Sequence, residues 1–350
     1  MTYDANNDHR LDLRNRGFLS AVGEPMLSQQ HDVASREEAM AIATTPEALA
    51  IEEAMAALLE PLDNEAIAPS AGLRIEQQSI VSAPDGNTIN LQIIRPDNDE
   101  TLPCVYYIHG GAMMVLSCFA PNYRAWGKML AHQGLCVVMV DFRNSLRPSS
   151  VEEVAPYPAG LNDCVSGFLW THEHAKALNI DPEKIIVAGE SGGGNLAIAT
   201  TMRLNAIGEN HRQLGLYALC PYILGRWPSE AHPSTTENNG VLIDISNNHA
   251  TMAYGIEAYN AKDPMAWPSF ATVEDVKDFP PSMISVNECD PLRDEGVAFY
   301  RLLNEAGVKA QCRQVMGSVH ANELFGAILP DMARTTARDI AGWIEEASLS

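Results

Sequence analysis

The stretch that decides the fold is residues 184–207, which reads KIIVAGESGGGNLAIATTMRLNAI. Its first seven residues form an apolar run typical of a buried strand, and the part from Gly192 onward carries apolar residues at helical spacing. The junction, GESGG at 189–193, matches the pattern G-x-S-x-G. Small residues are needed on a sharp strand-to-helix turn, where the serine hydroxyl projects out of the sheet. The stretch therefore predicts a strand, a tight turn that exposes Ser191, and a helix.

Strand-like and helix-like segments alternate on both sides of this turn. Apolar runs occur at 103–109, 136–142, 184–190, 215–222, 282–288 and 310–315. Amphipathic stretches occur at 122–133, 160–178, 192–209, 294–306 and 330–346. Earlier, the sequence around the Pro-Asp-Gly-Asn turn at 84–87 predicts a pair of antiparallel strands. Apolar strands alternating with helices indicate an α/β fold with a mixed, mostly parallel sheet of about eight strands, covered by helices on both faces.

Two regions do not follow this alternation. Residues 1–70 are helical in pattern, and TTPE at 44–47 is typical of a capping box with proline in the first turn. Residues 224–279 show no strand pattern, and a structureless loop of that length is unusual in a compact domain. We therefore predict a helical insertion at 224–279 that packs on the helices of 1–70 and forms a cap. The sheet-bearing domain then comprises 71–223 and 280–350.

The composition excludes several classes of protein. Forty-five acidic residues against 23 basic ones give a net charge of −22, which disfavours nucleic-acid binding. No apolar run is long enough for a membrane span. The N-terminus lacks the basic and apolar regions of a signal peptide, so we expect a cytoplasmic location. The seven cysteines include no CxxC pair and no close Cys/His set with zinc spacing, so we expect reduced thiols and no metal.

A second glycine-rich motif, HGGA at 109–112, follows the apolar run 103–109. Acyl transfer places negative charge on an oxygen, and each fixed N–H donor at that oxygen can contribute about 3 kcal/mol. We expect these donors, the oxyanion hole, to come from Gly110, Gly111, Ala112 and Gly192. His109 is interpreted as a structural histidine that holds the loop rather than as the catalytic base.

A serine nucleophile needs a base, and the base needs an acid that orients it. On this kind of sheet the chain order is serine, acid, histidine. His320 follows the last strand, whereas His249 falls in the predicted cap, so His320 is the predicted base. Asp290 ends a strand-like run at the edge where such sites assemble. Asp294 is the second choice, because an acid at a helix start commonly serves the helix dipole.

Apolar side chains after the predicted strand ends could line a substrate pocket. They are Met113, Met114, Tyr222 and Trp227. Such a lining suits an acyl or alcohol group. Ordinary packing explains these residues equally well, because large apolar side chains are usually buried.

HGGA, GESGG, DPLRDEG (290–296) and the late histidine together resemble the hormone-sensitive-lipase-like esterases, bacterial family IV, of the α/β-hydrolase fold. VDFR (140–143) and PYPA (156–159) also resemble family signatures, and the resemblance spans roughly residues 70 to 345. It implies a triad of Ser191, Asp290 and His320, a helical cap, no cofactor, and short- to medium-chain ester substrates. Family members often pair through the last strand, and the sequence leaves a homodimer open.

Other activities on the same triad, an amidase or a lactonase, fit these residues as well. Some relatives of the family are ligand receptors that lack the histidine; the presence of the full triad here favours an enzyme. The chain also departs from the family. Ala112 replaces a glycine, Gly192 stands where alanine is frequent, Ala321 follows the base where glycine is frequent, and 144–155 is longer than usual. We interpret 144–155 as a tolerated surface loop, with a reshaped site rim as the alternative.

Overall fold

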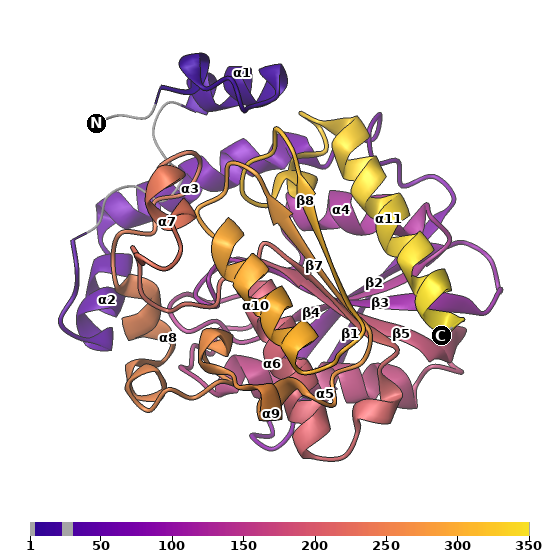
Figure 1. The fold of residues 1–350 in the computed structure, drawn as a ribbon. Helices are drawn as coiled ribbons and strands as arrows, with labels where there is room; N and C mark the ends of the chain where they lie inside the picture. The colour runs from indigo at the N-terminus through magenta and orange to yellow at the C-terminus, as the bar shows by residue number, and fades with distance from the viewer. Residues whose placement is uncertain (1–3, 23–30, 350) are drawn as a thin grey trace.

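A single eight-stranded sheet runs through the computed structural model, which describes residues 4–22 and 31–349 (Figure 1). The strands are β1 (Leu73–Val81), β2 (Thr88–Pro96), β3 (Leu102–Ile108), β4 (Cys136–Asp141), β5 (Ile180–Glu190), β6 (Gly215–Leu219), β7 (Ser282–Asn287) and β8 (Ala310–Val315). Their order across the sheet is β1-β2-β4-β3-β5-β6-β7-β8. Only the β1–β2 and β2–β4 pairs are antiparallel. The predicted mixed, mostly parallel sheet is therefore confirmed.

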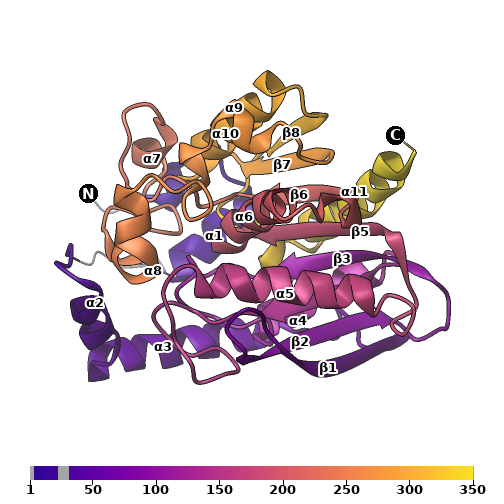
Figure 2. The same cartoon turned by 90° about the horizontal axis from the view of Figure 1, so that it is seen from below.

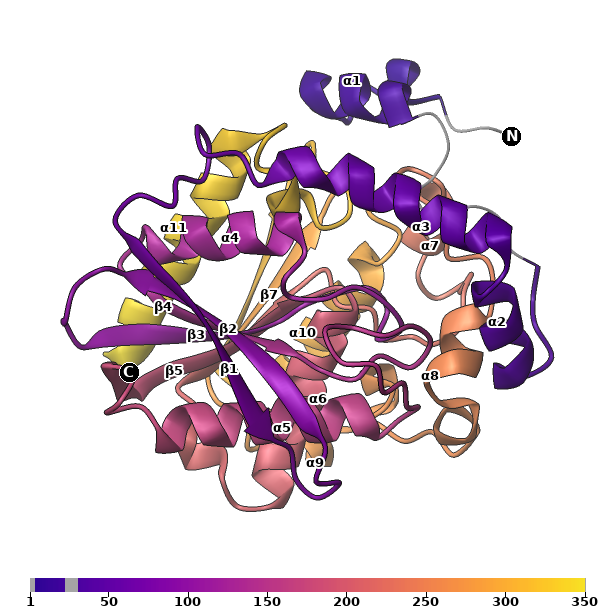
Figure 3. The ribbon, with the colours of Figure 1, turned by 180° about the vertical axis from the view of Figure 1, so that it is seen from behind.

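Helices cover both faces of the sheet (Figures 1 and 3). One face is covered by α5 (Ala159–Glu173), α6 (Gly192–Ala206) and α10 (Arg293–Glu305), and the other by α4 (Pro121–Ala131) and α11 (Pro330–Ser348). Successive strand side chains point to opposite faces, so Tyr106 packs with Phe168 of α5 while Tyr107 packs in the opposite core. Burying each such side chain contributes about 1.5–3 kcal/mol. This burial on both sides explains why the central strands read as continuous apolar runs.

Both the N-terminal region and the segment between β6 and β7 contain helices joined by turns and loops. Their helices are α1 (Leu13–Val22), α2 (Arg36–Ala43), α3 (Pro46–Leu59), α7 (Ser234–Glu237), α8 (His249–Asn260) and α9 (Val273–Val276). Short 3-10 helices are η1 (Ala5–Asn7), η2 (Glu60–Leu62), η3 (Asn210–Arg212), η4 (Pro268–Phe270) and η5 (Asn322–Phe325). In α3 the cap is Thr45, whose side chain accepts from Ala48 N, and not Thr44, because Pro46 occupies the first helical position.

The N-terminal helices contact the insertion directly, and Figure 2 shows α2 and α8 side by side at one end of the sheet. The side-chain oxygen of Asn248 accepts from Val33 N at 2.8 Å, and its amide nitrogen donates to Val33 O at 2.8 Å. Arg36 donates to Ala253 O in α8 and to Ser145 O. Two segments separated by some two hundred residues are therefore joined by hydrogen bonds.

Helix α1 packs on the loop that follows β8. Gly317 O accepts from Asp12 N at 3.1 Å and from the side-chain amide of Asn15 at 2.9 Å. The same amide donates to the Asn322 side chain at 2.8 Å, and Asn15 is buried. The first helix of the chain thus braces a loop near its end.

All seven cysteines are free, as predicted, and six of them are buried. Within residues 4–22 and 31–349, no helix combines the length and the apolar character that crossing a membrane requires. Helix α5 is shorter than the predicted 160–178, because a series of turns leads from its end at Glu173 into β5.

Candidate active site

Ser191 stands at the turn between β5 and α6, with φ 57° and ψ −122°. This strained backbone lifts the side chain above the carboxyl end of the sheet. The turn also requires its glycines, because a Cβ atom on Gly189 would collide with Gly193 O and one on Gly193 would collide with Ile108 O. The spacing of the G-x-S-x-G pattern is therefore explained by backbone contacts.

Three predicted residues form one chain of hydrogen bonds. His320 Nε2 lies 2.9 Å from Ser191 Oγ, and His320 Nδ1 lies 2.8 Å from Asp290 Oδ2. The other oxygen of Asp290 accepts from Leu292 N at 2.9 Å, which fixes the orientation of the carboxylate. Ser191 and His320 retain slight exposure, whereas Asp290 is fully buried. The sheet topology assembles them, since they follow β5, β7 and β8 at the same edge.

The pKa of His320 lies above its ordinary value of 6.5. Burial lowers the pKa, because the charged form loses solvation. The charge and the hydrogen bond of Asp290, with smaller contributions from Glu190 and Glu323, together raise it by more. The imidazole is therefore a somewhat stronger base than a free histidine, while its proton on Nδ1 is directed to Asp290.

The alternative acid and base lie in other hydrogen-bond networks. Asp294 accepts from Ser234 N at 2.7 Å and from the side chain of Arg293 at 2.8 Å. His249 in α8 bonds the carbonyl oxygen of His31. Neither residue is bonded to His320 or to Ser191. The structure thus brings together Asp290 and His320, the first choices from the sequence.

The loop after β3 lies directly against the serine turn. Gly111, Ala112 and Met113 have φ of 90°, 53° and 59°, so the chain turns sharply there. A Cβ atom on Gly192 would come within 2.7 Å of Ala112 N and 2.6 Å of Met113 N. The backbone amides of this loop and of the turn after Ser191 are therefore close neighbours, as the prediction of an oxyanion hole requires.

The N–H group of Gly110 has a different partner from the one that was predicted. Its N–H donates to Glu190 Oε1 at 2.8 Å and to Tyr123 Oη at 2.9 Å. Because this donor is already bonded, Gly110 does not supply an oxyanion donor, contrary to the expectation from the motif. Gly111, Ala112 and Gly192 remain the candidates.

Glu190, the residue before the serine, is a functional candidate that sequence reasoning missed. Its buried carboxyl accepts from Tyr107 Oη at 2.8 Å and Tyr123 Oη at 2.6 Å, besides Gly110 N. Burial raises the pKa of Glu190 to about 8, although the two tyrosine hydrogen bonds act in the opposite direction. At neutral pH the group is mostly protonated, and its proton is then accepted by one of the two tyrosine hydroxyls, which reverses that hydrogen bond. The one signal in the sequence was an ionisable residue at the end of an otherwise apolar strand.

His109 has the structural role that was predicted for it. It is fully buried, its ring stacks on Phe142 with centroids 4.2 Å apart, and its Nδ1 bonds Gly110 O at 2.9 Å. Burial lowers the pKa of His109, so the ring is neutral at neutral pH. It holds the loop and takes no part in the hydrogen-bond chain of the serine.

The segment 144–155 supports the same loop, so its first part is more than a surface loop. Ser145 donates to Met113 O from both its N–H, at 2.9 Å, and its hydroxyl, at 3.0 Å. The side chain of Asn144 donates to Leu116 O at 2.7 Å. Both residues are buried, whereas the later part of the segment is partly exposed. The alternative interpretation, a part in shaping the site, agrees better with these contacts.

The predicted pocket residues lie next to the triad. Tyr222 N donates to Ser191 O at 3.0 Å, and the Tyr222 ring stacks on Trp227 with centroids 4.2 Å apart. Met113 belongs to the loop beside Gly192. All three side chains are buried. Their contact with a substrate stays a prediction.

Three possible metal-ligand side chains approach one another at the site. The ligand atoms of Cys220, Asp290 and His320 all lie within 4.8 Å of one another, and this is the one such group within the described ranges 4–22 and 31–349. Two of the three are already bonded in the chain that leads to Ser191. Burial also raises the pKa of the Cys220 thiol, which disfavours the thiolate that metals prefer. The arrangement fits proton transfer better than metal binding.

Comparisons with known proteins agree with this architecture. A family model described as alpha/beta hydrolase fold matches residues 105–324. Carboxylesterase NlhH of Mycobacterium tuberculosis is 30% identical over 276 residues, which cover 77% of this chain and 82% of the relative. The structure of esterase Est22 has 55% identity and a TM-score of 0.94, over 97% of this chain and 99% of its own. Brefeldin A esterase, described as a bacterial homologue of human hormone-sensitive lipase, has 33% identity and a TM-score of 0.86, over 99% and 96%. The chain therefore belongs to the α/β-hydrolase family, among the esterases related to hormone-sensitive lipase.

Proposed function

We propose that this protein is a serine carboxylesterase that hydrolyses short- to medium-chain esters through an acyl-enzyme intermediate. The observation that carries the proposal is the hydrogen-bond chain Asp290–His320–Ser191 at the end of β5. The names of the relatives, carboxylesterase and esterase, support the same class of reaction.

In the first half-reaction, Ser191 Oγ attacks the ester carbonyl carbon while His320 Nε2 takes the hydroxyl proton. Asp290 stabilises the imidazolium that forms and keeps the ring oriented. The carbonyl oxygen becomes negative and accepts from the N–H groups of Gly111, Ala112 and Gly192. Each of these donors is expected to lower the barrier by about 3 kcal/mol. The tetrahedral species then expels the alcohol, which leaves with the proton held by His320.

In the second half-reaction, water attacks the acyl-enzyme and gives its proton to His320. The new tetrahedral species expels Ser191 Oγ, which recovers that proton, and the carboxylic acid departs. Glu190 supports both steps by being mostly uncharged at neutral pH. An ionised carboxylate directly before the serine would repel the negative oxygen, whereas a protonated one holds the loop through Gly110 without that cost.

Helices α1–α3 and the segment 224–279 are proposed to act together as the cap of the site. The support is the hydrogen bonding of Val33 and Arg36, at the start of α2, to α8 and the residue before it. The bond from Arg36 to Ser145 O also supports the proposal, because Ser145 in turn holds Met113. A cap connected to the loop in this way would influence which esters reach Ser191. The pairing of two copies through β8, the outermost strand of the sheet, stays a prediction that light scattering would test.

The test is Ser191→Ala, assayed on p-nitrophenyl esters of increasing acyl length, with amides and lactones in the same panel. We expect ester turnover to fall by a factor of about 10⁶, as when the nucleophile of another serine hydrolase is removed. Ser166→Ala on α5, where the hydroxyl bonds only the chain at Ala83, is the matched control and should keep full activity. A serine-directed phosphonate should add its mass to the peptide containing Ser191. Wild-type turnover in Ser191→Ala would refute the proposal, and faster cleavage of amides or lactones than of esters would reassign the substrate class.

A further inference from the structure

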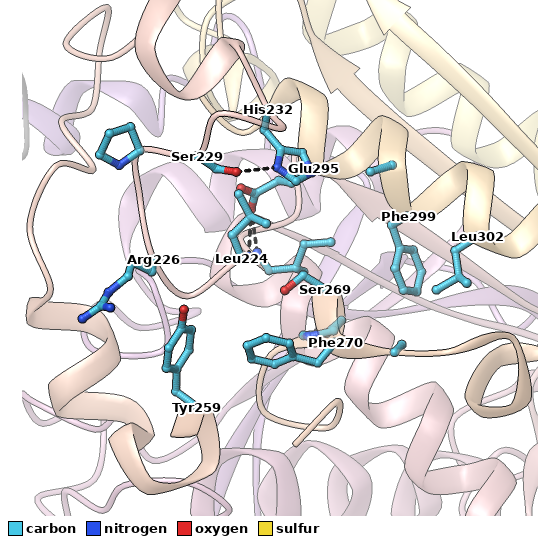
Figure 4. Close-up of a pocket in the computed structure, with 15 residues that line it drawn as sticks. Leu224, Arg226, Ser229, His232, Tyr259, Ser269, Phe270, Glu295, Phe299 and Leu302 are labelled. Atoms are coloured by element: carbon cyan, nitrogen blue, oxygen red, sulfur yellow. Dashed lines mark hydrogen bonds between the residues drawn. The ribbon is translucent and has the colours of Figure 1, made fainter. Parts of the chain in front are cut away.

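A cavity lies between the segment 224–279 and α10 (Figure 4). Its volume of about 520 Å³ falls within the range of about 300–1,000 Å³ that is typical of small-molecule sites. Its walls come from residues 223–232, the end of α8, η4 with the residue after it, and α10. None of Ser191, Asp290 and His320 lines it.

The lining differs between the two ends of this cavity. Figure 4 shows Arg226 and Tyr259 at one end and Phe299 with Leu302 at the opposite end. Phe270 lies between them on the same side as Tyr259. A ligand that fills the cavity would therefore meet a polar, cationic end and an apolar end.

Arg226 brings a positive charge to one end of the cavity. Arg226 is exposed, its guanidinium carbon lies 5.9 Å from the centroid of the Tyr259 ring, and no carboxylate in the described part of the chain forms an ion pair with it. Two other ionisable groups in the lining, Glu295 and His232, have shifted pKa values. Burial raises the pKa of Glu295 to about 8, and burial lowers the pKa of His232.

The wall on the Glu295 side is rigid. The Glu295 carboxyl accepts from Ile223 N at 2.7 Å and from Trp227 Nε1 at 2.8 Å. His232 Nδ1 bonds the hydroxyl of Ser229 at 2.9 Å. These bonds occupy the polar groups of Glu295, Ser229 and His232. Within residues 4–22 and 31–349 the Arg226 guanidinium forms no hydrogen bond or ion pair, so its donors are available to a ligand.

We propose that this cavity is a second binding site for a monocarboxylate with an apolar tail, held with the carboxylate at Arg226 and the tail along Phe270, Phe299 and Leu302. The guanidinium recognises a carboxylate by paired hydrogen bonds, and the tail removes apolar surface from water. The acid released from a medium-chain ester belongs to this class of ligand. That link rests on the proposed function, whereas the binding site does not.

The experiment is isothermal titration calorimetry with sodium octanoate on protein whose Ser191 carries a small phosphonate, which keeps the probe away from the catalytic serine. We expect one octanoate per chain. Octanol and octylammonium, which have the same tail without the negative charge, should bind at least about fivefold more weakly. No octanoate binding, or equal binding of the three probes, would overturn the proposal. If the phosphonate fails to label Ser191, the proposed function is contradicted, and the same titration is then made on the unlabelled protein.

Two variants locate the site. Arg226→Gln should weaken octanoate binding about fivefold and leave octanol binding unchanged, because it removes one charged contact. Ala298→Phe should abolish both, since it places a large side chain in the cavity. Arg301→Gln is the matched control, an exposed arginine on α10 that does not line the cavity, and should change nothing. Unchanged octanoate affinity in Arg226→Gln, with thermal unfolding like the wild type, would place the carboxylate elsewhere and refute the assignment.

Discussion

Replacing Glu190 by glutamine should change how stability depends on pH. The folded protein holds this carboxyl at a pKa of about 8, against 4.5 for a free glutamate. The difference corresponds to about 5 kcal/mol between the protonated and ionised forms. Because the pKa is raised on folding, the stability that the protonated form contributes is complete below pH 4.5 and is lost as the pH rises to about 8. Glutamine cannot ionise, so Glu190→Gln should not suffer this loss.

Urea unfolding followed by tryptophan fluorescence, at about pH 5.5 and about pH 8.5, measures the effect. The free energy of unfolding should decrease from the lower to the higher pH in both proteins. Ionisation of Glu190 should make this decrease about 3 kcal/mol larger in the wild type than in Glu190→Gln. Glu295, whose pKa is also about 8, contributes equally to both proteins and cancels in the comparison. Glutamine keeps a carbonyl acceptor for Gly110 N, so the fold should survive.

Glu305→Gln is the matched control, because Glu305 is exposed on α10 and its removal should leave the pH dependence of the wild type intact. Equal losses in the wild type and in Glu190→Gln would refute the reasoning. Such a result would mean that Glu190 ionises in the folded protein much as it does in the unfolded chain.

The remaining predictions concern the base, the acid and two glycines. Since the pKa of His320 lies above 6.5, kcat/KM for an ester should fall on acidification with a midpoint above pH 6.5, and a midpoint at or below that value would contradict the effect of Asp290. Asp290→Asn should lower kcat by about 10⁴, as the same change does in a serine protease, while thermal unfolding shows a folded protein. Gly342→Ala, in an exposed helix position with open space around it, should raise the free energy of unfolding by about 0.5–1 kcal/mol. Gly193→Ala should instead prevent normal folding, because the new Cβ atom would collide with Ile108 O; soluble, active Gly193→Ala protein would show that the turn is looser than described.

That Ser191, Asp290 and His320 lie together could be predicted from the sequence, because their positions are fixed by topology. Ser191, Asp290 and His320 each follow a strand, and parallel strands deliver their carboxyl ends to one edge whatever the detailed packing. The sheet could likewise be predicted from the alternation of apolar runs and amphipathic stretches. Helices cover both of its faces, so its central strands read as continuous apolar runs.

The sequence did not reveal the features of the site that depend on which partner an individual hydrogen bond has. The HGGA motif predicts amides near the oxyanion, but whether the N–H of Gly110 faces the substrate or Glu190 depends on where one carboxyl lies after folding. The burial of Glu190 and its bonds to two tyrosines come from separate strands and helices, so no local pattern records them. The same holds for Ser145, whose two bonds to Met113 O bring a supposed surface loop into the site.

The bonds from Asp12 and Asn15 to Gly317 tie the loop that carries His320 to a segment about three hundred residues earlier in the sequence. Loss of this segment would leave Gly317 O without these two donors. Damage to a helix that contributes no catalytic group would therefore reach the predicted base through the backbone of its loop.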